Sequence, residues 1–391
     1  ASGIVFKPGK IVLKIEREIN PERVSPDSPV EITLKIANLG SHIDEALFVD
    51  NLPPNLEVVQ GTTSLMTEFG ENQIKELRYT VKGKRGIYHI NGVHATANDA
   101  FAIFRRKEFI SAQGSIFIMP YVPKIRHVDI RPRQTRVYSG NVPARVGGPG
   151  VEFYGVREYH CGDALHRINW KATARHNHSL YSNEYEQERV ADVGLILDAR
   201  KCCDIHTPNG TLFEHLITST AALTDTLIKA GNRVGLLVYG GFLDWTFPGY
   251  GKVQRERIFQ ALTRAQTGDS LVFEKLENLP TKVFPTHSQL ILFSPLLDDD
   301  VLILVRLRAR GYQVMIISPD PILFQYDSLQ TSYASELGAR LARIERKLLF
   351  NKLRHAGIVV MNWDVRTPFD QAMNMALRRI PMWSQPPGGR L

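Results

Sequence analysis

Residues 193–198, VGLILD, decide the fold of the second half of the chain: five nonpolar residues in a row lead directly to an acid. An unbroken apolar run of this length is typical of a strand buried on both faces of a sheet. Similar runs recur at 233–240, 289–295, 313–319 and 358–364, with helix-like stretches such as 212–231 and 299–311 between them. This alternation predicts a doubly wound α/β domain over residues 189–385.

The first 119 residues follow a period of two instead. In residues 30–37, VEITLKIA, apolar and polar residues alternate, and the apolar set is Val30, Ile32, Leu34 and Ile36. Such alternation predicts half-buried antiparallel strands, and it returns in Leu77, Tyr79 and Val81. Short strands separated by turn residues such as NLG and KGKRG predict an Ig-like antiparallel β-sandwich over residues 1–119.

Residues 120–188 connect the two domains. Their first part is rich in Pro, Gly and Arg and ends in SGNVPARVGGPG at 139–150, so we expect a flexible loop there. Phosphate binding by its glycines is the weaker alternative, because the Gly-Lys-Ser/Thr ending of a phosphate loop is missing. Residues 386–391 are expected to be a loose tail.

Residues 157–175, REYHCGDALHRINWKATAR, form what we call the signature segment. Gly162-Asp163 is a helix start signal, because an Asp side chain can accept the free N–H groups of the first turn. We expect one helix with an apolar face (Leu165, Ile168, Ala172), a cationic face (Arg167, Lys171, Arg175) and Trp170 between them. The cations either pair with nearby glutamates in an inter-domain contact or bind an anion or partner; those glutamates are Glu152, Glu158, Glu184, Glu186 and Glu188.

The signature segment, residues 180–188 (LYSNEYEQE) and the strand VGLILD together resemble the signature of the domain of unknown function 58 family. The resemblance implies a β-sandwich before the signature, a von Willebrand factor A-like domain after it and a MoxR-type AAA+ ATPase as partner. It also implies a short transmembrane hairpin before the sandwich. Since the sequence starts at Ala1, we expect an N-terminal anchor beyond it, with the soluble portion on the cytoplasmic side of the cell membrane.

Asp198 ends the first α/β strand, where such sheets bind ligands, and the resemblance implies a metal site there. A von Willebrand factor A site uses Asp-x-Ser-x-Ser, a threonine and a further aspartate to give a hard cation oxygen ligands. In DARKC, Arg200 and Cys202 stand at the hydroxyl positions; Ser270 and Pro295 stand near the threonine and final acid positions. We therefore expect a degenerate metal ion-dependent adhesion site with no tight magnesium and no cofactor, in which Asp198 pairs with Arg200 or Lys201.

The composition restricts the chemical class of the partner only weakly. A net charge of +8 and a pI near 9.3 favour anionic partners. Cys161, Cys202 and Cys203 offer neither a disulfide framework nor metal-ligand spacing, which suits a reducing compartment. The most apolar window, 290–305, is interrupted by three aspartates, so no membrane span is expected; we expect these acids to open a helix.

Residues 336–357 have strong helical periodicity. We expect Leu337, Leu341, Ile344 and Leu348 to face the core, and the cations Arg340, Arg343, Lys347 and Arg354 to lie outside. That outer face is either solvated or able to lie on an anionic membrane.

These features favour a non-enzymatic adaptor or assembly factor acting with a MoxR-type ATPase. His166, His176 and His178 do not form a clear ligand set, and no nucleophile stands at a defined spacing from a base. Two alternatives remain: a metal-dependent hydrolase at Asp198, and a basic module that binds nucleic acid or acidic lipid through residues 131–145 and the signature cations. The expected partner or inter-domain residues are Arg157, Glu158, Tyr159, Gly162, Asp163, Arg167, Trp170 and Arg175.

Overall fold

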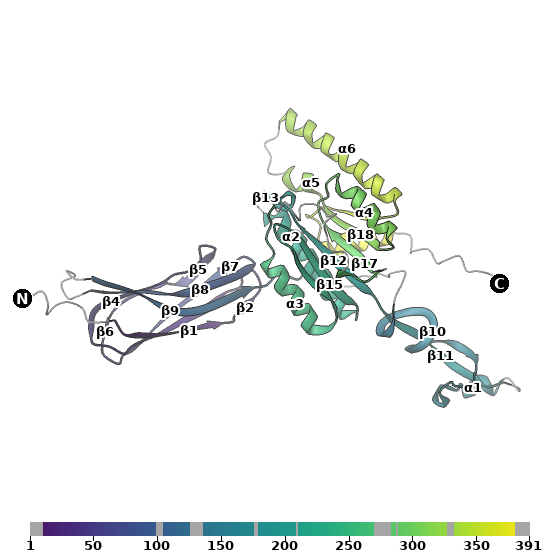
Figure 1. Ribbon diagram of the computed structural model, residues 1–391, viewed down its shortest axis with the longest axis horizontal. Coiled ribbons are helices and arrows are strands. Elements are labelled where there is room, and N and C mark those ends of the chain that lie inside the picture. Colours follow the sequence, from purple (N-terminus) through teal and green to yellow (C-terminus); the bar gives the residue numbers. More distant parts are fainter. Residues whose placement is uncertain are drawn as a thin grey trace, which may run out of the picture. The chain divides into compact units, whose positions relative to one another are not determined.

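The computed structural model describes residues 11–98, 105–125, 136–175, 179–208, 210–269, 283–286, 288–326 and 332–379. The chain divides into two compact units, the first holding residues 1–121 and the second most of the remainder (Figure 1). Four of the features expected from the sequence lie outside the described residues: Ser270, His176, His178 and the tail at 386–391.

The first unit is a β-sandwich of two sheets, as predicted. One sheet has the order β1 (Leu13–Asn20), β3 (Val30–Asn38), β7 (Ile74–Gly83), β5 (Leu56–Gly61). The other has the order β2 (Arg23–Val24), β9 (Arg105–Ile118), β8 (Gly86–Asn98), β4 (Ile43–Asp50), β6 (Ser64–Phe69). All pairs are antiparallel except β2 with β9.

The inward-facing residues of both sheets form one core. The alternating set predicted for β3 and β7 is buried, with Ile32, Leu34 and Val81 fully inaccessible. An ion pair also lies inside this core: the Arg17 guanidinium donates to both oxygens of Asp50, at 2.5 and 2.8 Å, and the Tyr79 hydroxyl donates to the same carboxylate. The side chains of Arg17 and Asp50 are 1% and 0% exposed. The sequence patterns did not reveal this buried pair.

The second unit is built on a six-stranded sheet. Its order is β16 (Asp244–Gly249), β15 (Arg233–Gly240), β12 (Asp192–Ala199), β17 (Gln289–Phe293), β18 (Gln313–Pro319), β19 (Val359–Trp363). All pairs are parallel except that of β15 with the edge strand β16. The strands predicted from the apolar runs are therefore confirmed. Because the chain goes from β12 outward to β15 and later returns to β17, the strand order reverses between β12 and β17.

Helices cover this sheet. The face carrying Ile196, Leu237 and Ile316 packs against α4 (Asp300–Ala309) and α6 (Tyr333–His355). The neighbouring Leu195 points to the opposite face, where α2 (Leu212–Lys229) packs against β12 and β15. Further elements around the sheet are α3 (Gly251–Arg264), α5 (Pro321–Tyr326), α7 (Phe369–Arg379), the 3₁₀ turn η3 (Lys201–Cys203) and the short pair β13 (His206–Thr207) and β14 (Gly210–Thr211). Within the described residues, no helix has the length and apolarity needed to cross a bilayer.

The predicted orientation of α6 is wrong. Its buried residues are Ala339, Leu349, Phe350 and Leu353. The set expected in the core is instead 47–57% exposed; we call it the outer stripe, and it consists of Leu337, Leu341, Ile344 and Leu348. The helix has two apolar faces, and periodicity alone does not indicate which of them packs on the sheet.

Residues 136–190 form what we call the signature hairpin. The long strand β10 (Arg136–Glu158) pairs antiparallel with β11 (Tyr181–Val190). The flexible loop expected up to residue 150 is therefore wrong from residue 136 onward. Pro and Gly in this stretch do not abolish pairing, because the register shifts at several points between Val137 and Gly155 and the ladder resumes after each shift.

Candidate functional site

The candidate site lies at the carboxyl ends of β12 and β17, where the strand order reverses. Asp198 is near the end of β12, Arg200 follows that strand, Ser294 follows β17, and Asp300 is the first residue of α4. In open α/β sheets this crevice is where ligands bind. The topology thus brings together residues that lie about 100 positions apart in the chain.

The Arg200 guanidinium bridges two carboxylates. It donates from Nε to Asp198 Oδ1 at 3.0 Å and from Nη2 to Asp198 Oδ2 at 2.7 Å. It also donates from Nη1 and Nη2 to the two oxygens of Asp300, at 3.0 and 2.8 Å. This doubly bidentate arrangement uses the planar fork that only arginine provides. The pairing predicted between Asp198 and Arg200 is present, and Asp300 is a second partner that the sequence did not indicate.

All three charged groups are buried. The side chains of Arg200, Asp198 and Asp300 are 6%, 0% and 2% exposed. Burial raises the pKa of Asp300 above its ordinary value, although the hydrogen bonds and charge of Arg200 act in the opposite direction. Burial would lower the pKa of Arg200, but its acidic surroundings outweigh this and raise it, so the guanidinium keeps its charge.

Further contacts hold this cluster in place. Asp198 Oδ1 accepts the backbone N–H of Arg200 at 3.0 Å, and Asp198 Oδ2 accepts the Ser294 hydroxyl at 2.6 Å. The Arg200 guanidinium lies 5.3 Å from the ring centroid of the buried Tyr239. The end of β15 comes so close to β12 that a Cβ on Gly240 would lie 2.3 Å from the Ala199 carbonyl. Any other residue would clash there. Gly240 also has a φ of +151°, which residues with a side chain rarely adopt.

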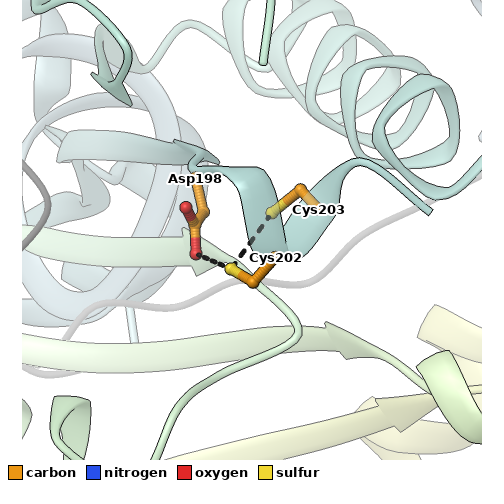
Figure 2. A group of neighbouring side chains, drawn as sticks. All are labelled: Asp198, Cys202 and Cys203. Carbon is orange, nitrogen blue, oxygen red and sulfur yellow. Dashed lines mark hydrogen bonds between the residues drawn. The ribbon is translucent and has the colours of Figure 1, made fainter. Parts of the chain in front are cut away.

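One group of potential metal ligands lies at this site. Among the described residues, Asp198, Cys202 and Cys203 have ligand atoms within 4.8 Å of one another (Figure 2). The two sulfurs are 4.0 Å apart, and Cys202 Sγ is 3.9 Å from Asp198 Oδ2. A hard cation such as Mg²⁺ needs about six oxygen ligands. Both Asp198 oxygens are already taken by Arg200 and Ser294, and thiols are poor Mg²⁺ ligands, so this set does not fit the metal that the resemblance implies.

A second, half-buried guanidinium lies along the same sheet edge. Arg346 of α6 donates to the carbonyls of Pro295 and Pro319, each at 2.7 Å, to the Ser318 hydroxyl at 2.9 Å and to Asn362 Oδ1 at 3.0 Å. Burial lowers its pKa to about 10. Arg346 thus joins the ends of β17, β18 and β19, although nothing in the helical pattern of α6 distinguishes it from the exposed arginines nearby.

The signature segment does not form the predicted helix. It contains the 3₁₀ turn η2 (Leu165–Arg167), capped by no side chain, and the one-turn helix α1 (Trp170–Thr173), whose N-terminus is capped by Asn169. Asp163 does not cap either element. Its carboxylate accepts both Nη groups of Arg157 at 2.7 Å and the backbone N–H of His160 at 3.0 Å.

This Arg157–Asp163 pair closes a turn at the end of the hairpin. The N–H of Asp163 donates to the His160 carbonyl at 3.0 Å, and Gly162 supplies the positive φ of +113° that the turn requires. The guanidinium of Arg157 and the N–H of His160 lower the pKa of Asp163 to about 2. Glu184 of β11 lies 3.7 Å from the Arg157 Nε, and the Tyr159 hydroxyl donates to the Asp163 carbonyl at 3.3 Å.

The outer surface of the signature hairpin is partly apolar. Trp170 is 68% exposed, Leu165 72% and Phe153 60%. Lys171, Arg175, Glu158 and His166 are exposed as well, and Arg167 is half-buried. Among the residues expected on the apolar face, Ile168 alone is buried, bridging to Ser182 of β11. The side chains of Glu152, Glu186 and Glu188, like residues 131–135, lie outside the described parts, so their predicted ion pairs stay predictions.

Several known sequences are similar to this one. The uncharacterized protein YeaD of Bacillus subtilis is 24% identical over 156 residues, which is 40% of this chain and 37% of that protein. The uncharacterized protein Rv1480 of Mycobacterium tuberculosis is 29% identical over 105 residues, covering 27% of this chain and 33% of that protein. The matches thus span about a third of these relatives' length.

Solved structures match part of the chain weakly. The CARDB domain of the Pyrococcus furiosus protein PF1109 aligns with 28% of this chain and 93% of its own, at 16% identity and a TM-score of 0.19. A cohesin from Archaeoglobus fulgidus aligns with 27% of this chain and 90% of its own, at 13% identity and a TM-score of 0.18. Residues 155–321 match the family described as protein of unknown function DUF58. This segment, which contains the signature and the Arg200 cluster, therefore belongs to the DUF58 family.

Proposed function

We propose that the second unit is a von Willebrand factor A-like domain in which Arg200 takes the place of the metal ion. Two observations support this: the reversal of strand order beside Asp198 and the antiparallel edge strand β16. On this proposal the chain is a non-enzymatic adaptor that works with a MoxR-type AAA+ ATPase, and its site is a degenerate metal ion-dependent adhesion site.

The observation that carries the proposal is the double bridge from Arg200 to Asp198 and Asp300. A divalent ion in an adhesion site neutralises acids and offers an open coordination position to an acidic ligand. A guanidinium that makes paired hydrogen bonds to two buried acids neutralises them, but it has no coordination position to offer to a further ligand. The site therefore serves structure, and a metal-assisted hydrolysis has no place to bind its cation.

A different surface must then bind the partner, and we assign this role to the signature hairpin. Exposed aromatic side chains are enriched at the centres of protein interfaces, and Trp is among the commonest hot-spot residues. Trp170 provides such an anchor, and Leu165 and Lys171 of the same segment are exposed as well. The Arg157–Asp163 pair fixes the turn that presents them.

The test is binding of the purified MoxR-type ATPase to the full chain, followed by biolayer interferometry. Trp170→Ala should weaken binding by roughly 30-fold, the effect of losing a hot spot of about 2 kcal/mol. Trp245→Ala is the matched control, because Trp245 is 45% exposed on β16 and is expected to leave binding unchanged. Absence of binding by the wild-type chain would refute the adaptor proposal, and equal binding by both variants would exclude the signature hairpin.

A further inference from the structure

The outer stripe of α6 is apolar, exposed and regularly spaced. Its four residues are 47–57% exposed, and Tyr333 at the start of the helix is 83% exposed. At 3.6 residues per turn the four aliphatic side chains fall within roughly 60° of one another and extend over about 16 Å of the helix. No described residue packs over them, although isolated exposed leucines would need no explanation.

The stripe points away from the domain. The residues that α6 packs against the sheet, including Leu349 and Leu353, lie roughly on the opposite side of the helix. The stripe therefore faces away from the sheet on which α6 packs.

Cations flank the stripe on one side. Arg340, Arg343 and Lys347 are all exposed, and the Arg340 side chain is 67% exposed beside Glu336 at 2.7 Å. Over its 23 residues α6 carries six Arg and Lys against two Glu, and all the cations except Arg346 are exposed. This charge selects an anionic partner, because the cations remain close to whatever the stripe contacts.

We propose that the outer stripe of α6 is a docking site for an anionic membrane surface. Leucines and isoleucine would enter the boundary between headgroups and acyl chains, and the flanking cations would contact acidic headgroups. Tyr333 at the end of the stripe has the amphipathic ring that suits this depth.

A helix of another chain fits the stripe less well. Sustained coiled-coil pairing needs three to four heptads, and the stripe offers about two. In an antiparallel pair, a second copy of this chain would also bring the same cationic flank against its own. The proposal concerns a surface separate from the Arg200 cluster and the signature hairpin, so it stands independently of the adaptor function.

Co-sedimentation with vesicles tests the proposal. The full chain should bind vesicles of 70% phosphatidylcholine and 30% phosphatidylserine, and bind pure phosphatidylcholine at least tenfold more weakly. Leu341→Ser/Ile344→Ser should lose at least tenfold in affinity. Val253→Ser on α3 is the matched control, because Val253 is 67% exposed elsewhere in the same unit and should not affect binding.

The charged flank has its own arm of the test. Arg343→Gln/Lys347→Gln should weaken binding by about fivefold for each cation removed. The proposal would be overturned if the folded wild-type chain did not bind the acidic vesicles, or if it bound neutral vesicles equally well. So would an unchanged affinity of Leu341→Ser/Ile344→Ser. If that variant instead abolished self-association of the chain, the stripe would be a contact between copies.

Discussion

Replacing Arg200 by methionine should destabilise the second unit strongly. The change removes the bidentate contacts to Asp198 and to Asp300 and leaves two carboxylates, 0% and 2% exposed, without a counter-charge. Breaking a buried ion pair by removing one partner costs about 3 to 5 kcal/mol. Arg200→Met should therefore lower the free energy of unfolding by about that amount. Lys201→Met, the adjacent control, should cost at most about 1 kcal/mol, because Lys201 is 77% exposed.

Urea unfolding followed by tryptophan fluorescence measures the stability of the second unit, where Arg200 lies. All four tryptophans, at positions 170, 245, 363 and 383, belong to the second unit, and Trp363 is buried. The sandwich contains no tryptophan, so the transition reports the second unit within the whole chain.

The pH dependence of the Arg200→Met cost gives an independent check. Burial already raises the pKa of Asp300, and in the variant the opposing effect of Arg200 disappears while the repulsion from Asp198 remains. A carboxyl group whose pKa is raised in the folded state stabilises the protein at low pH and loses that contribution as pH rises through the folded pKa. The cost should thus be smaller at pH 5 than at pH 8. A cost below about 1 kcal/mol at pH 8, or one independent of pH, would show that Arg200 does not neutralise two buried carboxylates.

Three further predictions concern the other charged groups. Asp50→Asn should lower the stability of the sandwich by about 3 to 5 kcal/mol, because it leaves the buried Arg17 without a counter-charge. The loss should appear as a far-UV circular dichroism transition at lower urea that tryptophan fluorescence does not follow. In a ¹³C titration, Asp163 should titrate with a pKa of about 2, and Arg157→Met should bring that pKa back toward about 4. Since the pKa of Asp163 is depressed in the folded state, its contribution to stability is present above the ordinary pKa and is lost as the pH falls toward 2. A titration unchanged by Arg157→Met would contradict the pairing. Arg346→Met should cost about 2 to 3 kcal/mol by tryptophan fluorescence, because it leaves the carbonyls at the strand ends without their charged donor; near-native stability would show that solvent replaces it.

The strands could be predicted from the sequence because burial leaves a local pattern. VGLILD forms most of β12 and VEITLKIA most of β3. Both could be predicted, because the burial pattern of a strand shows in the polarity of five to eight consecutive residues. The Asp198–Arg200 pair was also predictable, because its members are two positions apart. Asp300 was not: it was expected only to open α4, and its pairing depends on β12 and β17 being neighbours in the sheet.

Two predictions failed because a local signal had a competitor. Gly162-Asp163 has the composition of a helix start, but Arg157 in the preceding strand takes the Asp163 carboxylate and the chain turns instead. In α6 the periodicity was correctly identified, yet the helix has a second apolar face containing Leu349 and Leu353, and that face packs on the sheet. Both outcomes depend on tertiary contacts: the ion-pair partner of Asp163, and the face of α6 that packs on the sheet. Local sequence propensity does not include such contacts.

The claim that Arg200 takes the place of a metal ion is tested most directly by magnesium itself. The measurement is the urea unfolding of the metal-stripped wild-type chain, followed by tryptophan fluorescence, without and with 10 mM Mg²⁺. A site with a Kd of about 0.1 mM would raise the free energy of unfolding by about 2.7 kcal/mol at this concentration. We predict no change, because both oxygens of Asp198 are held by Arg200 and Ser294. A saturable stabilisation of that size would contradict the account.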